Sequence, residues 1–453
     1  MDSIDRRDFL LSTAATGAGL MLTQGALGKD TAKKSDDLNV AIIGVGRQGK
    51  ILLNHLLTKV SGIRMKAVCD FWSYGQKVGG GLCKNRKHEV TLYEDYQDML
   101  AREKDLDAVI IATPDFVHHE MTNACLEAGL HVYCEKEMSN DIEKARSMVR
   151  AAKKTGKLLQ IGHQRHSNPF YRHADHLMHK DKVFGDITTV SGQWHQQTPP
   201  MPVSKKLSGR YPIAGDVLKN YGYDSMEQFR NWRWFHKCGG GPMADLGSHQ
   251  VDIFIWYLKS PPASVYAVGG KDYALSQAKA NDIGYTPECF DHTIALYDWK
   301  TEFGDVHGHY EVNLTSSHGG VYEVFMGTNG SMSISEMREK NPMFKERTAD
   351  TLEWEDDAEK ISVDGGEAMM FDPLRSRKAK GKMDSEAMKL ADDLKKPAHV
   401  PHLENFFDAI RDSNVKLTCP AEVGFETCVA VLKANESAAT GKRIVFTPQD
   451  FVA

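Results

Sequence analysis

The sequence predicts an α/β fold with a doubly wound parallel sheet in its N-terminal third, followed by a second domain. Three observations support this. Short apolar runs alternate with helical patterns from Leu38 onward, and a glycine-rich turn joins the first apolar run to the first helix. The chain has 453 residues, which is too long for one ordinary core.

The first strand is expected over residues 38–43, because the apolar run "LNVAII" suits a strand buried on both faces. Gly44, Gly46 and Gly49 follow in G-x-G-x-x-G spacing and lead directly into a helical pattern. The first glycine permits the tight turn, the second lets backbone approach a pyrophosphate, and the third lets helix and strand pack closely. The N-terminus of the helix then presents N–H groups to phosphates.

The second strand, "IRMKAVCD", ends at Asp70, 21 residues after Gly49. A carboxylate at this place accepts hydrogen bonds from both ribose hydroxyls of a dinucleotide and repels a 2′-phosphate, so NAD is favoured over NADP. Arg47 would weaken that preference if its side chain reached the adenine ribose. Arg47 and Gln48 lie inside the glycine motif and are therefore counted among the cofactor-binding residues.

The alternation of strands and helices continues after Asp70. We expect a helix in "LYEDYQDMLARE", and then strand, turn, helix and strand in "LDAVIIATPDFVHHEMTNACLEAGLHVYCEKEMSN". A helix over 141–156 and a strand in "KLLQIGHQRHSNPFY" complete the first domain. This reading places the dinucleotide-binding domain at 38–165 and the second domain at 166–453.

Residues 1–28 are expected to be an export signal. Arg6 and Arg7 precede a short apolar stretch rich in alanine and glycine, and paired arginines before "FL" resemble the twin-arginine signal of bacteria. The stretch is too short and too rich in glycine to span a bilayer. No cysteine lies near the expected cleavage region, so a lipid anchor is not expected there. Residues 29–37 are expected to be a charged linker. The expected location is the periplasm. Because the protein cannot count on free NAD outside the cytoplasm, its cofactor would have to be loaded before export and held tightly.

Charge and cysteine usage limit the partners and the chemistry. The net charge of −5 argues against nucleic acid or an anionic membrane surface as a partner. The eight cysteines show no CxxC spacing, and several lie in apolar runs, so most are expected to be buried as small hydrophobic residues. A disulfide stays open, because an exported protein permits one.

The segment "IIATPDFVHHEMTNACLEAGLHVYCEKE", with the glycine motif before it and "GGGPMADLGSHQVD" after it, resembles the glucose–fructose oxidoreductase, inositol dehydrogenase and rhizopine-catabolism family, Gfo/Idh/MocA. The resemblance covers residues 38–260 and extends to the closing segment from "PHLENFFDAIRDSN" to "GKRIVF". It implies an α+β second domain with an open, mostly antiparallel sheet whose face forms a sugar pocket. It also implies a homodimer or homotetramer.

The same resemblance implies several cofactor contacts. Thr113, Pro114 and His118 would line the nicotinamide side of NAD, and Glu135 and Lys136 would form the family's glutamate–lysine pair at the end of a strand. Gln164 is counted with them. In "EKE" a glutamate, residue 137, stands where the family usually has proline, and this leaves the pose of the lysine open.

The segment "HKCGGGPMADLGSHQVDIFIWYL" is expected to carry Asp245 and His249 on one face of a helix that begins near Met243. In the family this pair joins Lys136 in the active site. Oxidising a secondary alcohol needs a base for the hydroxyl proton, and His249 is assigned that role. Lys136 would stabilise the developing alkoxide, and Asp245 would bind a substrate hydroxyl.

Sugar pockets combine aromatic platforms with dense hydrogen-bonding groups. "GQWHQQ", "GHQRHSNP" and "NWRWFHK" supply both, and the predicted substrate-binding residues from them are Arg165, Trp194, His195 and Trp232. His163 and His166 offer two metal-ligand types, but no third and fourth ligand of suitable spacing accompanies them. No metal site is therefore predicted.

Residues 335–398 are rich in charge and lack clear periodicity. They are expected to extend the last sheet strands with exposed loops, while an oligomer contact or a cap over the pocket stays open.

Three functions fit the sequence. The first is a sugar or glycoside oxidoreductase with tightly held NAD, acting for example at C3 and passing its hydride to a second sugar. The second is an NAD-dependent glycosidase that works by transient oxidation at C3 and elimination. The third is a non-catalytic sugar-binding protein. The retained Lys136 favours the first.

Overall fold

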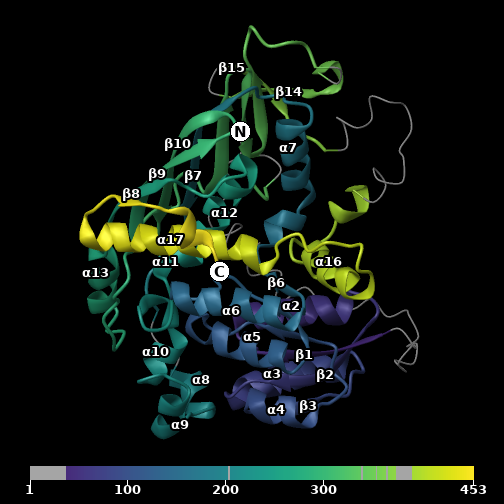
Figure 1. The fold of residues 1–453 in the computed structure, drawn as a ribbon. Coiled ribbons are helices and arrows are strands. Elements are labelled where there is room, and N and C mark those ends of the chain that lie inside the picture. Colours follow the sequence, from purple (N-terminus) through teal and green to yellow (C-terminus); the bar gives the residue numbers. More distant parts are fainter. Residues whose placement is uncertain (1–36, 202–204, 338–339, 353–354, 364–365, 374–389) are drawn as a thin grey trace, which may run out of the picture. The chain divides into compact units, whose positions relative to one another are not determined.

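The computed structural model describes residues 37–201, 205–337, 340–352, 355–363, 366–373 and 390–453 (Figure 1). The predicted signal over 1–28 and all but the last residue of the predicted linker lie outside these residues. Two sheets organise the described chain.

The N-terminal sheet contains six parallel strands in the order β3-β2-β1-β4-β5-β6. These strands are β1 (Leu38–Ile43), β2 (Ile63–Cys69), β3 (Thr91–Tyr93), β4 (Ala108–Ile111), β5 (His131–Cys134) and β6 (Leu159–Ile161). The strand order reverses direction between β1 and β4, and open sheets of this kind bind ligands beyond the carboxyl ends of the strands at that point. The predicted doubly wound Rossmann domain is confirmed.

Helices cover both faces of this sheet. One face packs on α4 (Tyr96–Arg102), α5 (His118–Glu127) and α6 (Ile142–Thr155), and the other on α2 (Arg47–Thr58), α3 (Ser73–Asn85) and α16 (Val400–Arg411). Leu403 and Phe406 of α16 share a buried cluster with Val40 and Ile42 of β1. A single domain boundary after residue 165 therefore does not describe the packing, because α16 completes the N-terminal core.

Two local predictions needed correction. The segment "LYEDYQDMLARE" is not all helix: Tyr93 ends β3, and Asp95 then caps α4 by accepting a hydrogen bond from the Gln97 backbone N–H at 2.6 Å. Helix α3 has no counterpart in the predicted elements, because its glycine run lowers helix propensity. Gly79 is needed there, since an added Cβ would lie 2.7 Å from the Val68 side chain.

The second sheet has ten strands within the described residues, in the order β14-β15-β13-β12-β11-β7-β10-β9-β8-β16. The strands are β7 (Ile187–His195), β8 (Ser264–Gly270), β9 (His292–Thr301), β10 (Gly304–Asn313), β11 (Val321–Gly327), β12 (Gly330–Ile334), β13 (Pro342–Lys345), β14 (Glu359–Val363), β15 (Gly366–Met370) and β16 (Ile444–Val445). Neighbours are antiparallel except β7 and β10, which are parallel. The open, mostly antiparallel sheet is confirmed, and β13–β15 extend it as expected for residues 335–398.

Helix α12 (Gly247–Leu258) lies between this sheet and α17 (Ala421–Thr440), the long yellow helix in Figure 1. It is apolar on nearly every side because it is covered on nearly every side. Its Phe254 packs edge-on against Trp299 and Phe325 of the sheet. The remaining helices are α7 (Pro169–His179), α8 (Lys205–Arg210), α9 (Gly215–Asn220), α10 (Met226–Arg230), α11 (Gly241–Asp245) and α13 (Asp272–Ala280).

All eight cysteines are buried, as the apolar runs predicted for most of them, and none of them forms a disulfide. Among the described residues, no helix combines the length and hydropathy that crossing a bilayer requires.

The shared cluster of α16 and β1 leads to a stability prediction. Phe406→Ala should lower the free energy of unfolding by about 3–5 kcal/mol, because it removes a fully buried ring from the N-terminal core. Chemical denaturation measures this. Val445→Ala, at a position 70% exposed, is the control and should change stability by less than about 0.5 kcal/mol. If Phe406→Ala changed the free energy of unfolding as little as Val445→Ala does, α16 would not be part of the core.

Candidate active site

The glycine turn after β1 has the geometry of a phosphate cradle. Gly44 adopts a φ of +90°, and an added Cβ would lie 2.6 Å from the Ala112 carbonyl oxygen. At Gly49 an added Cβ would lie 2.0 Å from the Gly44 carbonyl oxygen, whereas Gly46 opens on empty space. Helix α2 begins directly after Gly46 without a side-chain cap, so its first N–H groups suit an anion. The turn fits a dinucleotide pyrophosphate.

Asp70 follows β2 and is tied to this turn. Its Oδ2 accepts from the Val45 N–H at 2.8 Å, and its Oδ1 accepts from the Trp72 N–H at 2.9 Å. Burial raises the pKa of Asp70 to about 6, although both N–H groups act to lower it. Each carboxylate oxygen retains capacity to accept from a ribose hydroxyl. Arg47, the first residue of α2, is exposed.

Thr113 and Pro114 follow β4 and are half-buried at the same sheet edge, where the sequence placed them. His118 is different, because it is completely buried. Its Nδ1 lies 2.8 Å from the Glu137 carbonyl oxygen and its Nε2 lies 2.8 Å from the Thr113 carbonyl oxygen. The predicted contact of His118 with the cofactor is therefore wrong. The ring joins the loops after β4 and β5 beneath the site.

The loop after β5 carries Glu135 and Lys136. The Gln48 amide donates to Glu135 Oε1 at 3.2 Å and lies 2.8 Å from Nε2 of His399, which precedes α16. The Lys136–Glu137 peptide is cis. Burial raises the pKa of the Glu137 carboxyl to about 8, so this side chain is protonated near neutral pH.

Lys136 reaches into the second half of the chain. Its Nζ donates to the backbone oxygen of Asp245 and lies 3.3 Å from Asp245 Oδ1. Arg233 Nε donates to the other carboxylate oxygen at 2.7 Å. Burial alone would raise the pKa of Asp245, but the charges of Arg233 and Lys136 outweigh burial and lower it to about 2. Asp245 is thus ionised and fixes the ammonium of Lys136.

The single helix predicted to carry Asp245 and His249 is wrong. Helix α11 ends at Asp245, and α12 begins at Gly247, where an added Cβ would lie 2.7 Å from the Tyr310 ring. The break turns the two side chains to different neighbours. Asp245 meets the cations described above, while the His249 ring stacks on Trp194 at 5.5 Å between centroids and 21° between planes.

His249 is 9% exposed, and its Nδ1 has no hydrogen-bond partner among the described residues. Burial lowers the pKa of its imidazole well below the ordinary value, and the charges of Lys136 and Arg165 lower it further. The imidazole is therefore unprotonated near neutral pH and can accept a proton, and the lowered pKa makes it a weaker base than a solvent-exposed histidine. The environment keeps His249 in the form that a general base needs.

Arg165 was predicted to contact substrate but lies in the core, 2% exposed. Its Nη1 donates to Oε1 of Glu323, while the Tyr171 hydroxyl donates to Glu323 Oε2 at 2.9 Å. The prediction is wrong because the Arg165 guanidinium and the Glu323 carboxylate form a buried ion pair that neutralises both charges. The charge of Arg165 nevertheless lowers the pKa of His249.

His195 also lies away from the predicted pocket. Successive residues of a strand point to opposite faces. Trp194 of β7 faces α12, so His195 faces outward, where it contacts the His318 carbonyl oxygen at 2.7 Å and Glu311 at 3.2 Å. The sequence could not decide which of the two neighbours faced the helix.

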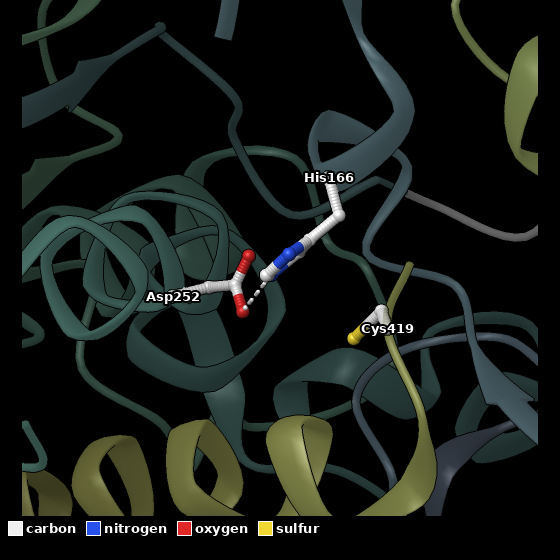
Figure 2. Close-up of side chains that lie close together, drawn as sticks. All are labelled: His166, Asp252 and Cys419. Carbon is white, nitrogen blue, oxygen red and sulfur yellow. Dashed lines mark hydrogen bonds and ion pairs between the residues drawn. The ribbon is translucent and has the colours of Figure 1, made fainter. Parts of the chain in front are cut away.

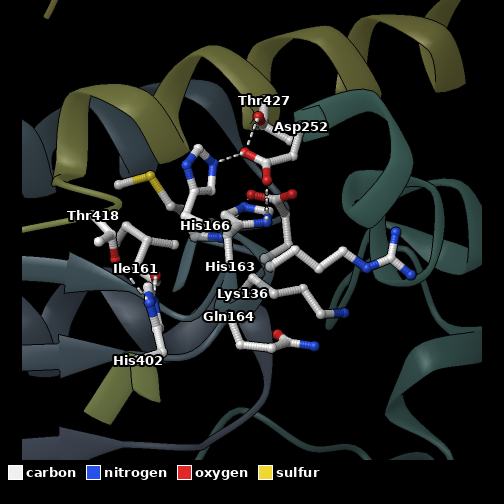
Figure 3. A network of polar contacts seen from close by, with 12 residues as sticks. Lys136, Ile161, His163, Gln164, His166, Asp252, His402, Thr418 and Thr427 are labelled. Carbon is white, nitrogen blue, oxygen red and sulfur yellow. Dashed lines mark hydrogen bonds and ion pairs between the residues drawn. The ribbon is translucent and has the colours of Figure 1, made fainter. Parts of the chain in front are cut away.

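Trp232 and Gln164 lie close to predicted site residues. The Arg233 guanidinium lies 4.2 Å above the Trp232 ring, which brings the indole near the arginine that pairs with Asp245. Gln164 Nε2 lies 3.4 Å from Oε1 of Glu336, and Figure 3 shows the Gln164 and Lys136 side chains extending in the same direction. Glu336 and His399 had no recognisable sequence signal, since Glu336 lies inside the aperiodic segment at 335–398 and His399 directly follows it.

Comparisons with known proteins agree with this geometry. Residues 38–163 match the family model described as "Oxidoreductase family, NAD-binding Rossmann fold" of Gfo/Idh/MocA, and residues 215–333 match the model of that family's C-terminal domain. The two models together match more than half of the chain.

Individual relatives are more distant. D-glucoside 3-dehydrogenase of Escherichia coli (strain K12) is 28% identical over 234 residues, which are 51% of this chain and 57% of that protein. A glycosyl hydrolase family 109 protein of Shewanella amazonensis is 32% identical over 175 residues, 34% of this chain and 38% of that protein. The first curated relatives are matched over 40% to 60% of their own length.

The structure of levoglucosan dehydrogenase in complex with NADH and L-sorbose has a TM-score of 0.66 at 17% identity, over 92% of this chain and all of that chain. This likeness concerns the fold. With both domain models matched and the glycine cradle in place, the chain belongs to the Gfo/Idh/MocA family of oxidoreductases.

Proposed function

We propose that this protein oxidises a secondary hydroxyl of a sugar or glycoside with tightly held NAD, and we favour C3 of a glycoside as the position. The observation that carries the proposal is an ammonium, Lys136, that is anchored on the ionised Asp245 and whose charge acts on the neutral imidazole of His249. The relative named D-glucoside 3-dehydrogenase supports the substrate class.

The chain's own residues divide the work. Because Nδ1 of His249 is buried and has no hydrogen-bond partner among the described residues, Nε2 is assigned to take the hydroxyl proton. The Lys136 ammonium stabilises the alkoxide that develops as this proton leaves. Gly44, Gly49 and Asp70 would hold NAD, which supplies the hydride acceptor when bound. Asp245 accepts a hydrogen bond from a substrate hydroxyl through the lone pairs that its cations leave open.

A second function is favoured by the likeness to a glycosyl hydrolase family 109 protein. In that function the same groups would serve a transient oxidation at C3, followed by elimination of the aglycone, addition of water and re-reduction. Retention of Lys136 favours net oxidoreduction. A non-catalytic sugar-binding role is disfavoured, since it has no need for an anchored ammonium and a buried, unprotonated imidazole.

The protein is further proposed to act as a homo-oligomer that pairs through the outer face of the large sheet. Tyr266 and Val268 of β8 lie directly opposite Leu296 and Ile294 of β9. All four side chains are exposed, between 39% and 53%. A contiguous exposed apolar patch of this kind is typical of a protein–protein contact.

The glycine cradle gives a test of cofactor binding. Gly49→Ala should reduce NAD affinity at least about tenfold, because the new Cβ collides with the Gly44 carbonyl oxygen and reshapes the turn. Bound NAD is measured as the dinucleotide that the protein releases on denaturation. The affinity for NAD is measured by fluorescence titration. Gly81→Ala on α3, where an added Cβ meets nothing within 4 Å, should leave NAD binding unchanged. A wild-type protein without bound NAD or affinity for it would refute the proposed function.

His249→Gln should lower kcat by roughly 10²–10⁴-fold with NAD still bound, since a general base is lost. The matched control is His176→Gln, which changes an exposed histidine on α7. Product analysis on an aryl glycoside separates the two functions: a keto-glycoside indicates dehydrogenation, and free aglycone with intact sugar indicates cleavage.

Because its lowered pKa keeps His249 neutral, the wild-type rate should not fall as pH drops through about 6.5.

Export by the twin-arginine route is proposed on Arg6 and Arg7. Replacing both with lysine should retain the protein in the cytoplasm, because the signal is read through the arginine pair. Cell fractionation with immunoblotting measures the distribution. Lys33→Arg with Lys34→Arg in the linker is the control, and export of the Arg6→Lys/Arg7→Lys variant at the wild-type level would contradict the route.

A further inference from the structure

A buried cluster of three metal-ligand types lies where three distant segments meet. His166 belongs to the short helical turn η3 (Gln164–Ser167), Asp252 to α12, and Cys419 to the segment entering α17. One ligand atom from each lies within 4.8 Å of the other two. Figure 2 shows the Asp252 carboxylate facing the His166 ring, with the Cys419 sulfur turned toward them. The three residues are at most 4% exposed, so the cluster is part of the interior.

The Asp252 carboxylate is only half satisfied by hydrogen bonds. Its Oδ1 contacts His166 Nε2 at 3.0 Å and accepts from the Thr427 hydroxyl at 3.2 Å. Its Oδ2 has no hydrogen-bond partner among the described residues. Leaving such a buried oxygen without a partner costs free energy. The free oxygen is therefore a vacant acceptor inside the core.

His163 adds two more unpartnered atoms at the same place. Its ring is 1% exposed, and neither nitrogen has a hydrogen-bond partner among the described residues. Nδ1 lies 3.7 Å from the free Oδ2 of Asp252, which is beyond hydrogen-bond range (Figure 3). A ring nitrogen and a carboxylate oxygen, both buried and without hydrogen-bond partners among the described residues, thus face each other across a short gap.

The charge of the cluster is also uncompensated. Within the described residues, Asp252 makes ion pairs only with His163 and His166, and with no lysine or arginine. A buried carboxylate without a cation is strongly unfavourable, because the interior solvates it poorly. A bound cation would remove this penalty and would give the unpartnered oxygen a ligand.

We propose that His166, Asp252 and Cys419 bind a divalent transition-metal ion of the zinc class, with His163 as the nearest further donor. Thiolate, imidazole and carboxylate together suit zinc, whereas magnesium and calcium select oxygen ligands. Binding releases the thiol proton of Cys419 to solvent, and the neutral His166 ring binds through the nitrogen that carries no proton. Since the ligands are buried, the ion is structural.

The position of this ion connects it to the active site without placing it there. Asp252 lies three residues after His249 on α12, and η3 contains Gln164. The ion would therefore fix the start of α12 against the end of the N-terminal domain. Sequence spacing alone identified only His163 and His166, because the other two ligands come from remote parts of the chain.

Metal content of the full-length protein tests the proposal. After incubation with zinc and removal of unbound ion, the wild type should retain about one zinc per chain by mass spectrometry. Cys419→Ser should retain at least about tenfold less, since serine is a poor zinc ligand. Cys125→Ser, which alters an equally buried thiol on α5, is the matched control and should retain the wild-type amount.

Cobalt gives a second readout. Added Co²⁺ should produce a thiolate-to-metal charge-transfer band in the wild type and in Cys125→Ser, but not in Cys419→Ser. If Cys419→Ser does not fold, Asp252→Asn keeps the shape of the side chain and should weaken cobalt binding at least about tenfold. A wild type that retains no zinc and shows no band, or a Cys419→Ser protein that matches the wild type, overturns the proposal. Neither readout depends on NAD or turnover.

Discussion

The contact between Lys136 and Asp245 is the interaction on which the active site depends. Lys136 follows the last residues of β5, and Asp245 ends α11, so their ion pair joins the Rossmann sheet to the helices of the second domain. The two side chains are only 10% and 17% exposed. Removing one partner of a buried ion pair lowers the free energy of unfolding by about 3–5 kcal/mol. Arg233 holds the carboxylate from its other side and fixes which oxygen faces Lys136.

Burial assigns a different protonation state to each neighbour of this pair. It raises the pKa of Glu137 to about 8 and that of Asp115 to about 7, whereas Asp245 is kept ionised by its two cations. The His249 imidazole stays neutral. Lys136 and Arg233 therefore carry two positive charges against one full negative charge at Asp245. Protonation of Glu137 and partial protonation of Asp115 and Glu135 limit the negative charge beside Lys136, which favours an alkoxide in the site.

The local features were predictable because they depend on neighbours in the sequence. The turn at Gly44 and Gly49, the acid at Asp70 and the pair at Glu135 and Lys136 lie where the sequence placed them. The errors concern the tertiary environment. Whether Trp194 or the following histidine faces α12 depends on how β7 sits in its sheet, and no spacing rule reveals that.

Burial of ionisable groups was the second source of error. Arg165 seemed available to substrate, but a glutamate 158 residues further along neutralises it inside the core. His118 carried a family role yet lies between two backbone carbonyl oxygens. In both cases the partner that holds the side chain is either remote in the sequence or a backbone atom. Residue type alone therefore could not predict the burial. The placing of α16 on the N-terminal sheet failed for the same reason, since Phe406 and Val40 are far apart in the chain.

The break between α11 and α12 shows how one such error conceals the design of the site. A continuous helix would stack Asp245 and His249 one turn apart and aim both side chains at the same neighbours. The interruption at Leu246 lets Asp245 meet Lys136 while His249 meets Trp194. Because α12 is covered on nearly every side, it cannot rotate to change the direction of His249. The orientation of the proposed base is therefore fixed by the packing of the second domain, and Lys136, the cation whose charge lowers its pKa, is supplied by the first.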